Sequence, residues 1–161
     1  MLERNYARAP QAAREVSATH SMMAANPRQQ RLPAVWLVYD VFGKWPALLA
    51  EPAPSADRVH LNGAWHYFRD CAFAGLGEID KADREMKVLA QTSHDPAVTD
   101  VLSGANSAAP ILAMLSSALS GAIAKARGRY GEAVLAFGQA VRLQDALNFK
   151  EPPDWPHSMR L

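Results

Sequence analysis

The sequence of 161 residues lacks the features of a secreted or membrane-spanning protein. It has a single cysteine, Cys71, so it cannot form an internal disulfide, which fits a reducing compartment. No run approaches the roughly 18 consecutive apolar residues of a membrane span, and the N-terminal residues lack the apolar core of a signal peptide. We therefore expect a cytoplasmic protein with no membrane partner.

The sequence also lacks an excess of positive or negative charge. Seventeen Lys and Arg residues against sixteen Asp and Glu residues leave a formal net charge of +1, which gives no electrostatic reason to expect binding to nucleic acid or an anionic membrane. Hydrophobic residues make up 49% of the chain and charged residues 20%, which is typical of a globular protein. We expect residues 1–161 to form one domain with a real core.

Motifs for catalysis are missing too. There is no Gly-x-Ser-x-Gly elbow, no phosphate-binding glycine loop and no dinucleotide fingerprint. Cys71 lies in the middle of an apolar predicted helix, where a thiol stays protonated and inert. Glu78 and Asp80 follow a predicted turn and are interpreted as charges at a helix N-terminus. We expect a protein that is not an enzyme.

Metal ligands do not occur at productive spacings. Two short clusters could suit copper(I): His20 with Met22 and Met23, and His157 with Met159. His60 and His66, however, lie about 240° apart around a helix and cannot share one metal. No paired-cysteine or His-Glu-x-x-His spacing occurs. We expect no metal and no cofactor, and a metal- or small-molecule-binding helical domain remains the alternative.

What the sequence does have is a repeated glycine signal. Gly43, Gly77 and Gly128 each end one apolar stretch and precede another, and the first two lie 34 residues apart. Glycine at such a position turns the chain after a helix, because it has no Cβ. A fixed period of this kind predicts stacked helical hairpins.

Periodicity and proline positions then divide the chain into elements. Helices are expected over 11–25, 32–42, 57–75, 79–91, 110–127 and 130–147, with two turns from Trp45, a stiff linker over 51–56 and a short helix over 96–102. The hairpins would span about 32–56, 57–91 and 110–147, with an insert at 92–109 and a C-terminal cap at 148–161. The helix over 57–75 carries two apolar stripes, so we expect neighbours on both sides of it. His66 and Asp70 lie one turn apart on this helix, which predicts a structural hydrogen bond.

The cap contains Trp155 and Met159, which would start a helix that does not continue. We expect this segment to fold back over the last hairpin or to pair with a second protomer, forming a homodimer.

The last hairpin resembles a tetratricopeptide repeat, and degenerate bacterial repeats of this family are the nearest resemblance. The matching residues around Gly128 are Gly121, Tyr130, Ala133, Phe137 and Ala140. The hairpin around Gly77 departs from the pattern, since Asp70 replaces a small residue, and the hairpin around Gly43 departs further. The resemblance implies an all-α, right-handed α-solenoid of about three antiparallel helical hairpins.

The family's inner groove is lined by the first helix of each pair. The resemblance thereby implies groove positions at Pro33, Leu37, Asp40, Tyr67, Cys71, Ala74, Ala118, Ala122 and Lys125. They include almost none of the cationic or amide donors that would grip a carboxylate, which favours an apolar peptide, another helix or the protein's own insert. The alternative is that these residues simply pack in the core.

We therefore predict a non-enzymatic adaptor or scaffold that binds a protein or peptide partner. The predicted partner-binding residues are Leu37, Asp40, Tyr67, Cys71 and Lys125. A fragment of a larger repeat protein is the remaining alternative.

Overall fold

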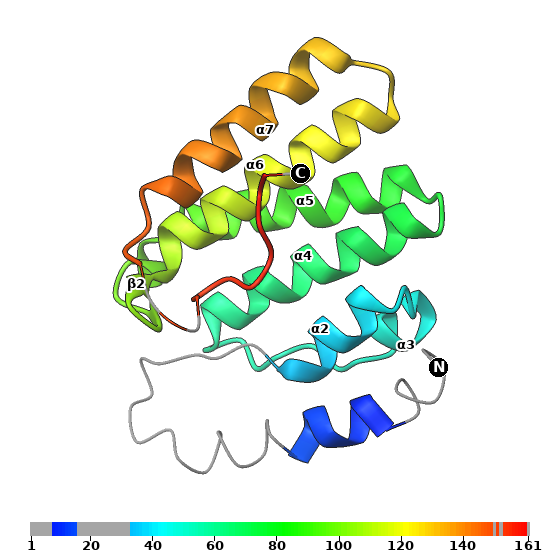
Figure 1. Cartoon of the computed structure of the whole chain (residues 1–161), viewed down its shortest axis with the longest axis vertical. Helices are drawn as coiled ribbons and strands as arrows, with labels where there is room; N and C mark the ends of the chain where they lie inside the picture. The colour runs from blue at the N-terminus through cyan, green and yellow to red at the C-terminus, as the bar shows by residue number, and fades with distance from the viewer. Residues whose placement is uncertain (1–7, 16–32, 150, 152, 161) are drawn as a thin grey trace.

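A computed structural model describes residues 8–15, 33–149, 151 and 153–160 (Figure 1). The described chain is mostly helical, as predicted. Its helices are α2 (Ala34–Val41), α3 (Trp45–Leu49), α4 (Val59–Gly75), α5 (Ile79–Ser93), the 3-10 helix η1 (Pro96–Val98), α6 (Ala108–Ala126) and α7 (Tyr130–Asp145). Residues 8–15 are also helical, whereas the rest of the helix predicted over 11–25 lies outside the described residues.

The three predicted glycine turns are present and share one geometry. Gly43, Gly77 and Gly128 have φ angles of 61°, 79° and 72°, a left-handed conformation that side chains with a Cβ rarely adopt. After each glycine, the next backbone N–H donates at 2.8 Å to the carbonyl five residues earlier: Lys44 to Tyr39, Glu78 to Phe73 and Arg129 to Ala124. This bond is typical of a Schellman helix end, so each glycine closes one helix and sets the direction of the next.

The helices pack as successive pairs, α2 with α3, α4 with α5 and α6 with α7 (Figure 1). Helix α4 contacts α2 and α3 on one side and α5 and α6 on the other, and α5 also contacts α6. The neighbours expected on both sides of α4 are therefore present. The core between the pairs includes Phe68 of α4 and Leu112 and Leu115 of α6, all nearly inaccessible to solvent.

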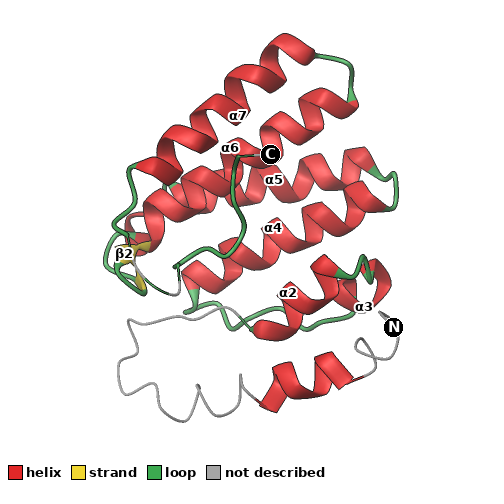
Figure 2. Cartoon of the chain, viewed as in Figure 1, coloured by secondary structure: helices red, strands yellow, loops and turns green. Residues whose placement is uncertain are grey.

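The segment over 92–109 corrects one prediction. In place of a helix over 96–102, the chain forms η1 and then a small antiparallel hairpin of β1 (Leu102–Ser103) and β2 (Asn106–Ser107), the yellow strands of Figure 2. Asp95 caps η1 by accepting the Ala97 N–H at 2.8 Å. Gly104 has a φ of 79°, which permits a two-residue hairpin turn. Local turn chemistry therefore prevails over the helical pattern here.

Two further predictions are also corrected. The described residues of the C-terminal cap, 151 and 153–160, contain no helix. His66 does not bond Asp70, because its Nδ1 lies 2.6 Å from Glu85 Oε2 on α5. Arg69 Nε donates to the other oxygen of Glu85 at 2.9 Å. The carboxylate on the facing helix is thus the partner that His66 meets, in place of the carboxyl one turn along its own helix.

Helix α6 is long and apolar enough, by length and composition alone, to cross a membrane, and it is the one such helix among the described residues. Half of its most apolar window is buried inside the fold (50%), and core helices meet the same criterion. The burial follows from its position, since α6 contacts α4, α5 and α7.

Gly121 of α6 is required by close packing against α7. A Cβ added there would lie 2.8 Å from ring carbons of Phe137. We expect Gly121→Ala to lower the free energy of unfolding by about 1–3 kcal/mol, because overpacking outweighs alanine's better helix propensity. Gly131→Ala is the matched control: its Cβ meets nothing within 4 Å, so it should stabilise by roughly 0.4–1 kcal/mol. Urea unfolding of both variants tests this, and equal effects would contradict it.

Candidate interaction surface

The C-terminal segment, defined here as residues 153–160, lies across the first helices of the pairs. In Figure 1 it is the red trace that passes in front of α4 and α6. Trp155 is its buried residue, with 3% of its surface exposed. The indole meets Tyr67 edge-on, with ring centroids 5.0 Å apart, and lies tilted on Phe68 at 5.8 Å. Helix α4 therefore supplies an aromatic site for this side chain.

The segment continues from α4 towards α2 and α7. His157 Nδ1 lies 3.7 Å from Asp40 Oδ2 on α2. Burial raises the pKa of the Asp40 carboxyl, and the neighbouring His157 acts in the opposite direction. On α7, Gln144 Nε2 donates to the His157 carbonyl at 3.1 Å, and Gln144 Oε1 accepts the Met159 N–H at 3.0 Å. The segment thus bridges α2, α4 and α7.

The β-hairpin holds the beginning of the segment. Asp154 Oδ2 accepts the backbone N–H groups of Ala105 and Asn106, both at 2.9 Å, and the Asn106 Nδ2 amide at 2.7 Å. Asn106 itself is only 6% exposed and exchanges two hydrogen bonds with the backbone of Asn148, at 2.8 and 3.1 Å. The inserted residues 92–109 therefore carry an anchor for the C-terminal segment.

The predicted partner-binding residues are placed unequally. Asp40 and Tyr67 contact the segment, and Cys71 lies close to both: Tyr67 and Cys71 share a side-chain hydrogen bond, and the charge of Asp40 acts on both. Leu37 is half-buried and packs against the core. Lys125 is exposed in the last turn of α6, at the end away from the β-hairpin. Asn106 and Asp154 were not predicted, because nothing local links residues 48 positions apart.

Two buried titratable groups also lie on α4. Burial lowers the pKa of His60 from 6.5 to about 4, while the Asp154 charge acts in the opposite direction. Burial raises the pKa of Asp70 from 3.8 to about 8, and the Glu85 and Asp83 charges add to the shift. At neutral pH both side chains are therefore uncharged. Burial also raises the pKa of the Cys71 thiol, which keeps it protonated.

These groups do not form a metal site. Within residues 8–15, 33–149, 151 and 153–160, no three His, Cys, Asp or Glu side chains come close enough to hold an ion.

No family model, curated protein or solved structure matches this chain. A function therefore has to be derived from the chemistry of the surface itself.

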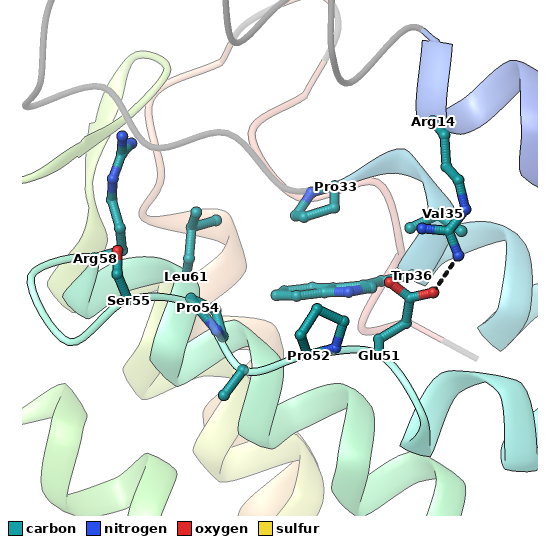
Figure 3. A pocket seen from close by; sticks show the side chains of 11 residues that line it. Arg14, Pro33, Val35, Trp36, Glu51, Pro52, Pro54, Ser55, Arg58 and Leu61 are labelled. Carbon is teal, nitrogen blue, oxygen red and sulfur yellow. Dashed lines mark hydrogen bonds and ion pairs between the residues drawn. The ribbon is translucent and has the colours of Figure 1, made fainter.

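A separate cavity of about 490 Å³ opens between α2, the helical residues 8–15 and the linker after α3. Figure 3 shows the flat ring of Trp36 between Pro33 and Pro52, and the Arg14–Glu51 ion pair at one side. The nitrogen and oxygen of that pair are 2.5 Å apart. The lining combines three prolines and Trp36 with charged and aliphatic residues, and it includes none of the five predicted partner-binding residues. The face under the C-terminal segment is therefore the stronger candidate site.

Proposed function

We propose that the chain is a non-enzymatic protein-interaction module, a right-handed solenoid similar to tetratricopeptide repeats. The repeated glycine turns support this architecture, as do the contacts between successive helix pairs. The resemblance implies a small residue at Gly121 that lets α6 and α7 approach closely, and the short distance between Gly121 and the Phe137 ring supports this. In this proposal the groove is the face of α2 and α4 that lies under the C-terminal segment.

The observation that carries the function is the burial of Trp155 against Tyr67 and Phe68. A non-helical stretch of chain already lies on this face, with one aromatic side chain as its anchor. Peptide-binding surfaces of interaction modules use the same arrangement of aromatic anchors with polar contacts at the rim. The uncharged, buried state of His60 and Asp70 supports a role outside catalysis, since neither is exposed to a substrate.

The test is capture of partners from cell extract, followed by quantitative affinity measurement for the partner recovered. We expect Tyr67→Ala to weaken that affinity by about 1–2 kcal/mol, as truncation of an aromatic anchor does. Tyr130→Ala is the matched control, because this tyrosine lies on α7 and is 68% exposed. If the affinity for the partner were unchanged by Tyr67→Ala but abolished by Tyr130→Ala, the binding surface would lie on α7 and not on α4.

A further inference from the structure

We propose that residues 153–160 are a built-in ligand, and that the groove recognises an extended peptide in which an acidic residue directly precedes a tryptophan. A partner protein carrying this dipeptide would displace the chain's own Asp154 and Trp155. The inference rests on the proposed function. It adds the chemistry of the partner and identifies residues 153–160 as the segment that covers the groove.

The acidic position is recognised by donors that are already in place. The two backbone N–H groups and the Asn106 amide converge on one carboxylate oxygen of Asp154. Hydrogen bonds to a charged acceptor are stronger than those between neutral groups. These donors belong to the β-hairpin, which is outside the helix pairs, so the hairpin would present them equally to an acidic residue of another chain.

The tryptophan position is apolar and incompletely satisfied. Tyr67 and Phe68 form its aromatic wall, but the buried indole Nε1 of Trp155 has no hydrogen-bond partner among the described residues. A buried donor without a partner weakens the interaction that contains it. Recognition at this position therefore comes from the aromatic wall and not from a hydrogen bond to the indole.

Most of the segment is exposed or half-buried, and the ion pair of its Arg160 lies at the surface. Pro153, Pro156, Ser158 and Arg160 are exposed, and Trp155 alone is buried among its residues. Phe149, before the segment, is 87% exposed. Attachment to the chain gives such a segment an effective concentration of about millimolar, so a free peptide competes poorly until the tethered copy is weakened. Tethering therefore acts together with the burial of Trp155 to keep the segment on α4.

The experiment uses the full chain and a fluorescent peptide with the sequence of residues 148–161. We expect the double variant Asp154→Ala/Trp155→Ala to bind this peptide at least about 10-fold more tightly than the wild-type protein does, because the tethered competitor is lost. Peptides with alanine at either the aspartate or the tryptophan position should bind at least about 10-fold more weakly than the unaltered peptide. A folded double variant that fails to bind, or that binds the altered peptides equally, would overturn the proposal.

A second design removes dependence on the folding of that variant. A protease site inserted after the exposed Phe149 allows the intact chain to fold before it is cut. Exchange of the released segment for labelled peptide supports the inference, whereas failure of the cut, folded protein to take up the peptide contradicts it. A captured partner that needs Tyr67 but is not displaced by the peptide would overturn this inference alone. A partner indifferent to Tyr67 would overturn the proposed function.

Discussion

Trp155→Ala is expected to lower the free energy of unfolding by about 3–5 kcal/mol, the usual cost of truncating a buried aromatic residue. The indole is 3% exposed and contacts both Tyr67 and Phe68, so its removal leaves a cavity between the C-terminal segment and α4. Urea unfolding followed by circular dichroism measures the change. The effect should be large although the residue lies only six positions from the end of the sequence.

Phe149→Ala is the control for this substitution, since Phe149 is an aromatic residue close by in sequence that is 87% exposed. Its replacement should change the stability by no more than about 0.5 kcal/mol. If Trp155→Ala proved equally mild, the segment would not be docked on α4 in solution.

Asp70→Asn is expected to stabilise the protein at pH 8 by about 2–4 kcal/mol and to have little effect near pH 4. The pKa of Asp70 is raised from 3.8 to about 8, so between these values the folded protein retains a proton that the unfolded chain has lost. The stability of the wild type therefore falls as the pH rises through this range. Asparagine is neutral throughout, which removes the loss, although its buried amide needs partners of its own.

His60 also makes the stability of the folded protein depend on pH, in the opposite direction to Asp70. Its pKa is lowered from 6.5 to about 4, so the folded state loses stability as the pH falls through that window. In the wild type the two opposite slopes offset each other between about pH 4 and 6.5. In Asp70→Asn the decline caused by Asp70 is removed while the His60 slope remains, so the melting temperature should rise with pH up to about 6.5 more steeply than in the wild type.

Melting temperatures measured from pH 4 to pH 8.5 test both signatures. Asp80→Asn is the control, because the Asp80 side chain is 90% exposed and pairs with Arg127 only at the surface. It should leave the pH profile unchanged. An Asp70→Asn profile that kept the wild-type decline towards pH 8 would show that Asp70 is ionised in the folded protein.

The helices were predictable because their signals are local. The three glycines and the apolar periodicities act within a few residues, and the helix boundaries fall within two or three positions of those expected for α4 to α7. Asp70 departs from the repeat pattern, which has a small residue at this position. In the structure, Gly121 on α6 leaves room for the Phe137 ring, whereas Asp70 on α4 is a buried carboxyl.

The surface was only partly predictable. Repeat spacing placed Asp40, Tyr67 and Cys71 on one face, but the occupant of that face depends on contacts between distant parts of the chain. The Asp154–Asn106 bonds join residues 48 positions apart, and the His66–Glu85 contact crosses from one helix to the next. Side-chain partners of this kind are fixed by the packed structure, and no local pattern in the sequence encodes them.

The bridging contacts of His157 also bear on how the molecule comes apart. In a linear array with contacts only between adjacent units, each end can fray independently of the other. Here His157 meets Asp40 of α2 through its ring and Gln144 of α7 through its backbone, so α2 and the last described helix share one residue. Opening at α7 therefore removes support from α2, and the described fold gains a cooperativity that contacts between neighbouring helices alone would not provide.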